Sequence, residues 1–286
     1  MAGCDRPANC APGPDCVSAV GAGGDLALAH ALADTADAIS MRHFEGHRLQ
    51  PETKPDGSPV TEADRMVEAA VRTQLGRLRP DDGFVGEESG VHGSGGRRWF
   101  VDPIDGTNRF LAGRLDWRTL IAVEDGGIVT MGLVSVPAMG QRWWAARSAG
   151  AWIQTVGDEP RRLAATDTAR LDSAAFATWP AVTDLPVPWR APASRLAASC
   201  GPPRPPAHAP AQVSHGALLV ASGQLDAFLL AGIGPWDLAA MVPIVEEAGG
   251  RFSDVAGGRA LDAGAAVFTN GVLHQQILDR LTSKDR

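Results

Sequence analysis

The chain has 286 residues, 44% of them hydrophobic, which is enough to bury one large core or two modest ones. Its formal net charge of −7 argues against broad binding to nucleic acid or to anionic membranes. The longest apolar region, residues 213–233, is interrupted by His215, Gln224 and Asp226, and it therefore predicts no membrane span.

Residues 1–24 are rich in Ala, Gly and Pro and poor in large apolar side chains, which predicts a disordered N-terminal extension. This segment shows no secretory signal led by Arg or Lys. Three of the four cysteines lie in it, and Cys200 lies in another proline-rich stretch. Their spacing matches neither a zinc site nor a disulfide framework, so we expect a cytoplasmic protein.

The first part of the chain predicts two helices packed on a largely antiparallel sheet. Apolar residues at helical spacing predict a first helix over residues 25–42 and a second one that begins near Thr61, with Lys54 in the loop between them. Short apolar runs and glycine-containing turns predict strands and two hairpins. The strands cover residues 84–85, 99–101, 119–124, 128–136, 143–146 and 151–154.

A boundary at residues 163–168 divides the chain into two predicted lobes, residues 25–165 and 166–286. In the second lobe, strands and helices alternate, which favours an α/β arrangement. Strands are expected at 174–177, 225–230, 251–254 and 266–269, and helices at 216–222, 236–248 and 272–281. The proline-rich stretch at 179–212 predicts few regular elements.

The segment Asp102-Pro-Ile-Asp-Gly-Thr107 sets two carboxylates on a short turn after an apolar strand. Asp102 and Asp105 repel each other unless a cation lies between them. Gly106 allows close approach of the backbone to a ligand, and Thr107 can open a helix whose free N–H groups favour an anion. Taken alone, Asp-Pro and Asp-Gly are also ordinary turn dipeptides.

Three further acid-bearing segments lie at the ends of predicted elements. Glu87 and Glu88 follow an apolar run, Asp237 opens an alanine-rich helix, and Thr61 with Asp64 opens another helix. Separately, Asp237 could be a helix cap, Thr61 and Asp64 a capping box, and the two glutamates a solvated loop. Because hard divalent cations such as Mg²⁺ prefer carboxylate and carbonyl oxygens, the four segments together predict a metal site.

These motifs resemble the inositol monophosphatase family of magnesium-dependent, often lithium-sensitive phosphatases. The similarity rests on Gly86-Glu-Glu88, then Asp102-Pro-Ile-Asp-Gly-Thr107, then Trp236-Asp237, and extends from Asp25 to the C-terminus. Within the family, residues 53–65 and 142–147 look most like actinobacterial histidinol-phosphate phosphatases. The resemblance implies a mixed α+β and α/β fold, built as a layered α-β-α-β-α sandwich with the site between two lobes.

The same resemblance implies which residues hold the cofactor, two or three Mg²⁺ ions per site. Glu87, Asp102 and the backbone carbonyl of Ile104 would hold one ion. Asp102, Asp105 and Asp237 would hold a second, with Asp102 as the bridge. Paired metals of this kind activate a water on one side and stabilise the leaving oxygen on the other.

The resemblance also implies roles for residues around the metals. Thr107, oriented by Asp64, would position the attacking water and accept its proton, and the N–H groups of Gly106 and Thr107 would cradle the phosphate. Glu88 would support the metals as a neighbour or a third-metal ligand. Lys54 either touches the phosphate and its waters or is a solvated loop lysine.

Specificity is the part where the chain departs from the family pattern. Inositol and histidinol phosphatases commonly carry an acid seven residues before the Trp-Asp aspartate, where it binds substrate hydroxyl or amino groups. Here that position is Leu230, which predicts a substrate with a less polar group and poor activity on inositol phosphate. The alternative is neutral drift at this position, with recognition supplied by a neighbouring residue or subunit.

We therefore expect a Mg²⁺-dependent phosphomonoesterase that hydrolyses a small-molecule phosphate ester. The leading substrate is histidinol phosphate, followed by inositol or sugar phosphates and by a specialised-metabolite phosphate. The alternative is a catalytically silent binding member of the same fold, which loss of Asp105 or Asp237 would have favoured. Because relatives are often dimers, a homodimer is expected, with no nucleic-acid or membrane partner.

Overall fold

The computed structural model describes residues 14–46, 51–55, 57–202 and 215–283, and side chains from residue 24 onward. A short ribbon of β1 (Glu52–Thr53) and β2 (Pro59–Val60) precedes the main sheets. The helices are α1 (Pro14–Gly46), α2 (Glu62–Leu78), α3 (Thr107–Leu111), α4 (Val187–Ser199), α5 (Gly216–Ala221), α6 (Pro235–Ala239), α7 (Met241–Glu247) and α8 (His274–Thr282). Among the described helices, none combines the length and apolar character that crossing a membrane requires.

The larger sheet has eight strands in the order β10-β9-β8-β7-β6-β5-β3-β4. They are β3 (Gly83–Gly86), β4 (Gly90–His92), β5 (Arg97–Asp105), β6 (Arg118–Asp125), β7 (Ile128–Val136), β8 (Gln141–Ala146), β9 (Ala151–Thr155) and β10 (Arg161–Arg162). All neighbours are antiparallel except β3 and β5, which confirms the largely antiparallel prediction. The predicted hairpin turns are also present, with Gly126 and Gly127 at positive φ in the first.

The smaller sheet has four strands in the order β11-β12-β14-β13. They are β11 (Phe176–Trp179), β12 (Ala227–Ala231), β13 (Arg251–Asp254) and β14 (Ala265–Thr269). β11 runs parallel to β12, and the other neighbours are antiparallel. All four strands lie where the sequence predicted them, whereas the division into lobes at residue 165 stays a prediction.

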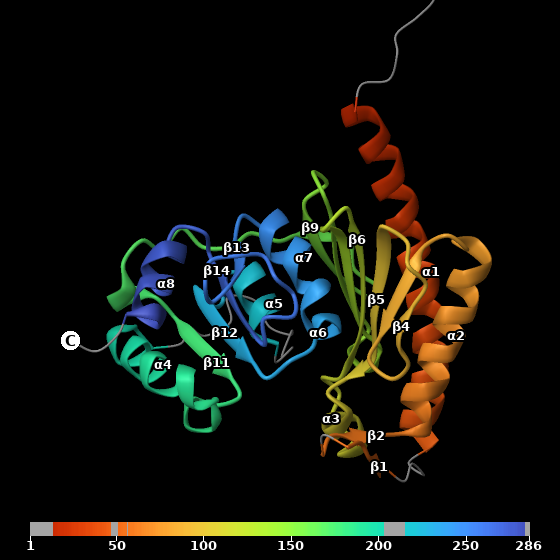
Figure 1. The fold of residues 1–286 in the computed structure, drawn as a ribbon, viewed down its shortest axis with the longest axis horizontal. Coiled ribbons are helices and arrows are strands. Elements are labelled where there is room, and N and C mark those ends of the chain that lie inside the picture. Colours follow the sequence, from red (N-terminus) through yellow and green to blue (C-terminus); the bar gives the residue numbers. More distant parts are fainter. Residues whose placement is uncertain (1–13, 47–50, 56, 203–214, 284–286) are drawn as a thin grey trace, which may run out of the picture.

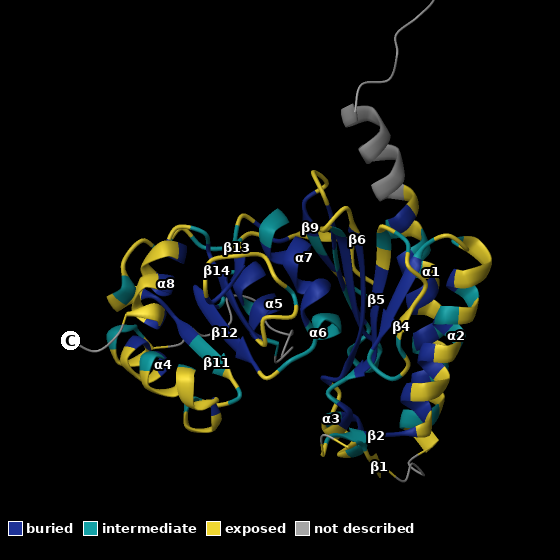
Figure 2. Ribbon diagram, viewed as in Figure 1, coloured by how far each residue is buried: buried dark blue, intermediate teal, exposed yellow. Residues whose placement is uncertain are grey.

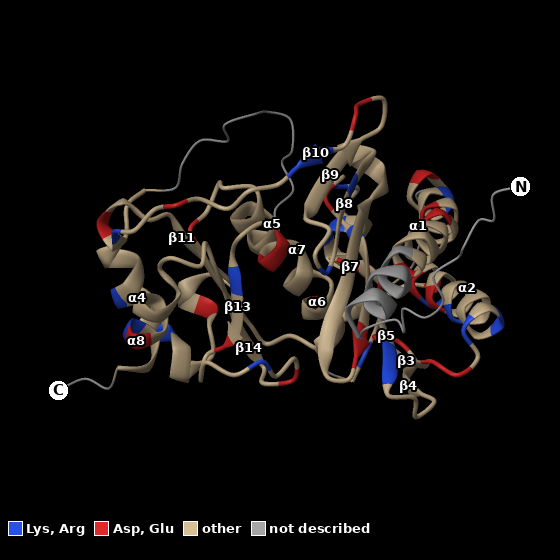
Figure 3. Cartoon of the chain, turned by 90° about the horizontal axis from the view of Figure 1, so that it is seen from above, with Lys and Arg blue, Asp and Glu red and all other residues tan. Residues whose placement is uncertain are grey.

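The sheets alternate with three layers of helices, as Figure 1 shows. The outer face of the larger sheet is covered by α1 and α2, and α5, α6 and α7 lie between the two sheets. The outer face of the smaller sheet is covered by α4 and α8. This is the layered α-β-α-β-α sandwich that the resemblance implied, and Figure 3 shows acidic and basic residues along its outer helices.

Apolar side chains fill the interfaces between these layers, and Figure 2 shows the central strands, such as β6, β12 and β14, buried. The largest cluster lies between the sheets, where Leu120 and Trp143 of the larger sheet share a core with Met241, Phe252 and Phe268. Each such side chain contributes about 1.5–3 kcal/mol when it leaves water. This shared core holds the two sheets, and the parts of the site that they carry, at a fixed separation.

The first helix is longer than predicted. It begins at Pro14, inside the segment that we expected to be a disordered extension, and not at Asp25. Pro14 is well suited to a first helical turn, since φ is already fixed and the missing N–H has no partner there. Beyond Pro14 the segment has no other proline, so its alanines can continue the helix. Residues 1–13 lie outside the described residues.

The proline-rich region is also more regular than predicted, because the 13-residue helix α4 lies within it. Pro186 is the N-terminal cap of α4 and Pro188 falls in its first turn, where no N–H is needed. Ala193 and Leu196 are buried against α8 and the smaller sheet. Pro192 lies inside α4 without ending it. Proline content alone was therefore a poor guide to where regular elements form. Residues 203–214 lie outside the described part.

The helix predicted over residues 236–248 is divided at Ala240 into α6 and α7. Pro243 explains the division, because it has no N–H to donate to the carbonyl of Ala239, four residues earlier. Gly132 of β7 faces this break, and a Cβ built on Gly132 would lie 2.2 Å from the carbonyl oxygen of Ala240. The absence of a side chain at Gly132 thus allows α7 to pack directly on the larger sheet.

Candidate functional site

Three carboxylates from distant parts of the chain meet beside the end of β5. Asp102 and Asp105 lie in the last four residues of that strand, and Asp237 lies in the first turn of α6. One carboxylate oxygen from each lies within 4.8 Å of the other two. Asp102 is only 1% exposed, and its Oδ1 has no hydrogen-bond partner among the described residues. Such an oxygen needs a cation or a donor.

A β-bulge brings Asp102 and Asp105 onto the same side of the strand. Residues three apart in a regular strand point to opposite faces. Here the pairing of β5 with β6 shifts between Asp102 and Asp105, and the two residues between them include Pro103, which has no N–H for the ladder. The carbonyl of Pro103 accepts a hydrogen bond from Thr119 Oγ1 at 2.8 Å, which fixes the bulge.

Asp237 is held by its own helix. Its Oδ2 accepts the backbone N–H of Gly234 at 2.7 Å, as an acid in the first turn of a helix does. The cap and the metal-site interpretations of Asp237 are therefore compatible, because one carboxylate oxygen serves the helix while the carboxylate also joins the cluster.

The electrostatics of the cluster favour a bound cation. Burial, and then the negative charges of Glu87, Asp105 and Asp237, raise the pKa of Asp102 well above its usual range. Burial and the charge of Asp105 raise the pKa of Asp237 to about 7. Carboxylates that repel one another in this way bind a hard divalent cation well. The positive charge of the cation offsets their repulsion, and such a cation prefers oxygen ligands.

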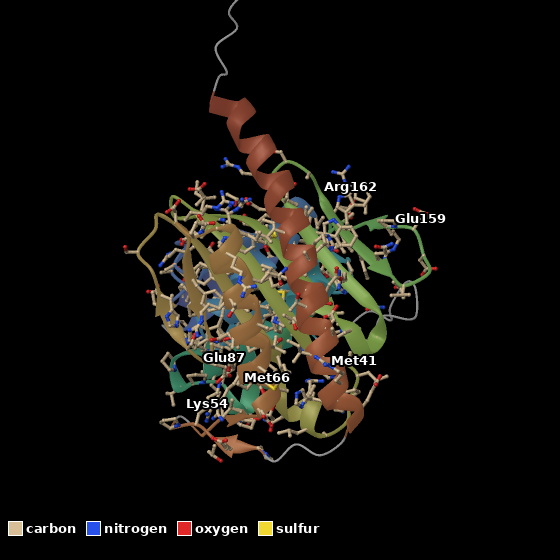
Figure 4. The ribbon with its side chains drawn as sticks, turned by 90° about the vertical axis from the view of Figure 1, so that its right-hand side faces the viewer. Met41, Lys54, Met66, Glu87, Glu159 and Arg162 are labelled. Carbon is tan, nitrogen blue, oxygen red and sulfur yellow. The ribbon has the colours of Figure 1, made fainter. Side chains whose placement is uncertain are left out.

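Glu87 contributes charge to this cluster, but its carboxylate binds a lysine. Lys54 Nζ lies 2.7 Å from Glu87 Oε1 and 2.7 Å from Glu88 Oε1, and Figure 4 shows Lys54 and Glu87 side by side. The side chain of Lys54 is 16% exposed, which excludes the solvated-loop interpretation. Burial raises the pKa of Glu88 to about 7, although Lys54 opposes the shift.

Asp64 serves two partners. Its Oδ2 accepts the backbone N–H and the hydroxyl of Thr61 at 2.8 and 2.6 Å, so the capping box of α2 is present. Its Oδ1 accepts the hydroxyl of Thr107 at 3.3 Å. The same hydroxyl lies 3.2 Å from the carbonyl oxygen of Ile104, the predicted backbone ligand. Burial raises the pKa of Asp64. The structure therefore brings Asp64, Thr107 and Ile104 together.

Gly106 joins β5 to the five-residue helix α3. Its φ of 87° is in the left-handed region, which glycine adopts without strain. A Cβ at this position would lie 3.2 Å from Cδ of Arg109, so a larger residue would also crowd the turn. Its predicted role in cradling a phosphate, together with that of the Thr107 N–H, stays a prediction.

A cavity of about 90 Å³ adjoins the acid cluster, and residues of both sheets line it. It contains Asp105 and Asp237 on one side and Leu230 of β12 on the other, so the residue predicted to shape specificity does line the pocket. The remaining lining residues are Gly106, Arg109, Arg118, Trp179, His215, Gly216, Phe228 and Ile233. The pocket thus continues from the acid cluster into an apolar region.

Two arginines in this pocket were missed by the sequence analysis. Arg118 is 4% exposed, and its Nε lies 2.8 Å from Asp105 Oδ2. Arg109 forms an ion pair with Asp116. A signal existed in the sequence, because an arginine next to Trp117 at the start of an otherwise apolar strand is unusual unless it is paired.

Comparison with known proteins agrees with this geometry. A model of the inositol monophosphatase family matches residues 25–285. The chain is 42% identical to a histidinol-phosphatase of Mycobacterium tuberculosis, covering 91% of this chain and 98% of that one, and 39% identical to a histidinol-phosphatase of Streptomyces coelicolor, covering 91% and 97%. The solved structure of the extragenic suppressor protein suhB from Bartonella henselae is similar, with a TM-score of 0.76 and 26% identity over 92% of this chain and all of that one.

Proposed function

The chain belongs to the inositol monophosphatase family and is a phosphoric monoester hydrolase, and we propose that it uses Mg²⁺ to hydrolyse histidinol phosphate. The observation that carries the metal assignment is the cluster of Asp102, Asp105 and Asp237, with an unpartnered and buried oxygen on Asp102. An all-oxygen donor set of this kind suits Mg²⁺ better than it suits softer metals.

In the proposal, Glu87, Asp102 and the carbonyl of Ile104 would hold one Mg²⁺ ion, and Asp102, Asp105 and Asp237 would hold a second. Bound divalent cations of this kind would supply an easily deprotonated water and stabilise the charge of the leaving oxygen. Lys54 Nζ lies 2.7 Å from Glu87 Oε1, so the other carboxylate oxygen of Glu87 is the one that Lys54 leaves for an ion.

The remaining residues act on the water and the phosphate. The Thr107 hydroxyl, which donates a hydrogen bond to Asp64 Oδ1 at 3.3 Å, would orient the attacking water, accept its proton and pass its own proton to the Asp64 carboxylate. The N–H groups of Gly106 and Thr107 face the phosphate at the start of α3. Glu88, whose pKa is raised to about 7 by burial, supports the metal-binding side of this arrangement.

Histidinol phosphate is the first substrate because the two relatives named above are histidinol-phosphatases. Inositol or sugar phosphates, and a specialised-metabolite phosphate, are the alternatives, because the family model covers residues 25–285. Leu230 weighs against the polyol substrates, because it lines the pocket where substrate hydroxyls would lie. A catalytically silent member is disfavoured, since Asp105 and Asp237 are both present and adjacent.

The test is a phosphate-release screen in Mg²⁺ over histidinol phosphate, inositol 1-phosphate, sugar phosphates and adenosine 3′,5′-bisphosphate. We expect the highest kcat/KM on histidinol phosphate and no release in EDTA. Release that persists after complete metal removal would contradict the metal assignment, and silence on every ester would contradict the phosphatase itself.

We also propose a cytoplasmic homodimer. The family is the support for the dimer, and the acidic, cysteine-poor composition is the support for the cytoplasm. Light scattering on the purified protein should give a mass twice that of the 29.9 kDa chain. A monomeric mass at working concentration would contradict the dimer without affecting the assignment of the site.

A further inference from the structure

The pocket beside the acid cluster must receive the alcohol part of the substrate, if the phosphate lies at that cluster as proposed above. The two share Asp105 and Asp237, so the pocket begins where the ester oxygen would be. Its far wall then contacts whatever group the alcohol carries. The chemistry of that wall therefore reports the class of alcohol.

One wall is apolar and flat. Phe228 and Leu230 are two residues apart on β12 and point to the same face, and both are buried. Trp179 of β11 is the register partner of Leu230. The ring of His215 meets the ring of Phe228 edge to face, with 5.7 Å between centroids. A planar group packs against such rings better than a chair-shaped polyol does, because it can stack on a ring face.

The polar groups beyond the acid cluster are hydrogen-bond donors. Arg118 and Arg109 both line the pocket, and guanidinium groups only donate. Arg118 is 4% exposed, and its Nη1 has no acceptor among the described residues, although its Nε faces Asp105. A buried guanidinium nitrogen with no acceptor is costly unless a ligand supplies one.

His215 adds a third donor. Its Nδ1 accepts the backbone N–H of Ala217 at 3.3 Å, which leaves the proton of a neutral ring on Nε2. Burial, and then the positive charges of Arg118 and Arg109, lower the pKa of His215 well below its usual range, so the ring is neutral at physiological pH. Among the described lining residues, the only carboxylates are Asp105 and Asp237, which belong to the acid cluster.

We propose that this pocket selects a phosphate ester whose alcohol ends in a planar group with a hydrogen-bond acceptor or a negative charge, and that it rejects a cation there. A neutral imidazole ring meets this description through its unprotonated nitrogen, and a carboxylate on a flat ring meets it more strongly. A protonated imidazole, an ammonium group at that end of the alcohol, or a polyol does not. The ammonium of histidinol phosphate is on the carbon next to the ester CH₂ and not at that end. Arg118 is the main specificity-determining residue, and Arg109 supports it.

The experiment uses three aryl phosphates that share one scaffold: phenyl phosphate, 4-carboxyphenyl phosphate and 4-(aminomethyl)phenyl phosphate. The measured quantity is the ratio of kcat/KM for the carboxylate to that for the amine, in Mg²⁺, for the full-length protein. We expect wild type to favour the carboxylate and Arg118→Gln to lower the ratio at least about tenfold. Comparing variants by this ratio cancels both leaving-group differences and any change in metal binding through Asp105.

Arg98→Gln is the matched control, because Arg98 is also ion-paired on the larger sheet, with Glu124, but lies outside the pocket. Its ratio should equal that of wild type. If Arg118→Gln does not fold, Arg109→Gln, on a less buried side chain, should lower the ratio in the same direction.

A wild-type ratio below that of Arg118→Gln and Arg109→Gln, or a ratio that neither substitution changes, overturns the inference while leaving the phosphatase intact. Release from histidinol phosphate but from none of the three aryl esters overturns the inference alone, whereas silence on histidinol phosphate and on the other esters of the screen overturns the proposed function as well. A carboxylate preference without any neutral-imidazole activity on histidinol phosphate above pH 7 supports the pocket chemistry and assigns the substrate to the anionic class.

Discussion

The two sheets contribute different chemistry to the pocket that lies between them. The larger sheet provides Asp102 and Asp105, two of the three carboxylates of the acid cluster. The smaller sheet provides Trp179, Phe228 and Leu230, which are apolar or aromatic. In the proposed function, any phosphate ester needs the charged side, whereas only some alcohols fit the apolar side. Reaction and recognition would then depend on separate sheets, and substitutions on each should have separable consequences.

Arg118 is the residue that connects the two sides. It belongs to the larger sheet and pairs with Asp105, yet it also lines the pocket. A substitution there should therefore change both turnover and selectivity. At other positions, effects on turnover and effects on selectivity should be separable, and the largest effects are expected on the charged side.

Asp105→Asn and Asp237→Asn should each reduce kcat/KM by more than about 100-fold on every ester, since loss of a mere outer partner of a metal costs 10–100-fold. Each removes one negative charge from the cluster. Circular dichroism should show an unchanged fold, and Mg²⁺ titration calorimetry should show weakened binding. A loss confined to one substrate would contradict the assignment of this side to the reaction.

Asp64→Asn should lower kcat about 10–100-fold and leave Mg²⁺ affinity close to wild type, because its Oδ1 holds the Thr107 hydroxyl. The matched control is Thr61→Ala, which removes the same capping box but not the contact to Thr107. Both variants should lose about 1 kcal/mol of stability. An equal loss of kcat in both would mean that Asp64 acts only through the helix.

Leu230→Glu tests the apolar side. The new carboxylate should raise kcat/KM for inositol 1-phosphate about tenfold relative to phenyl phosphate, because it offers an acceptor to hydroxyl groups that leucine leaves unpaired. The control is Leu230→Met, which keeps an apolar side chain at the same position. A glutamate at Leu229 would not serve, because that side chain packs in the core shared with α4 and α8. Wild type that already prefers inositol 1-phosphate, with no gain in Leu230→Glu, would contradict the altered pocket.

Metal removal should affect stability in a pH-dependent way. Burial and repulsion raise the pKa of Asp102 and bring that of Asp237 to about 7. These carboxyls bind protons more tightly in the folded than in the unfolded protein. The metal-free protein should therefore lose stability as pH rises from about 4 to about 7.

The measurement is the difference in Tm between protein in excess Mg²⁺ and protein in EDTA, at pH 5 and at pH 8. The gap should be wider at pH 8 by several degrees, since about 1 kcal/mol corresponds to roughly 2–4 °C in a chain of this size. In Asp237→Asn, the Tm difference between Mg²⁺ and EDTA should change less between pH 5 and pH 8 than it does in wild type. An equal gap at both would contradict the proposed linkage.

The smallest effect is expected from removing residues 2–13. These residues contain no large apolar side chain that could dock on the core. Activity should stay near wild type and Tm should move by less than about 1 °C. A larger fall would indicate that the segment binds the core or a second subunit.

The acid cluster on the charged side of the site was predictable because its carboxylates lie in short local patterns. Asp102 and Asp105 follow an apolar strand, and Asp237 opens a helix, so residue types and element ends were sufficient. That Asp64 would meet Thr107, 43 residues away, came from the family resemblance alone. Local pattern carries no information on that contact.

The recognition side was predictable only at Leu230. Arg118 faces Asp105 because β5 and β6 pair across a bulge, and Trp179 reaches Leu230 through a parallel strand pair that joins distant segments. No local spacing encodes either contact. The missed helix α4 has a similar cause, since proline content predicted a break while the location of Pro186 and Pro188 permitted a helix start.

The packing at Gly132 leaves no room for even one added carbon atom, and this constraint reaches the acid cluster. Asp237 is carried by α6, and α6 continues into α7, whose first turn sits on Gly132 with no room for a methyl group. The methyl group of an alanine there would push α7, and with it α6, away from the larger sheet. Asp237 on α6 would then lie farther from Asp102 and Asp105 on β5. Divalent-ion affinity would then be set from a position that has no polar side-chain atom. A Gly132→Ala protein that binds Mg²⁺ as tightly as the parent would show that the interface yields elsewhere.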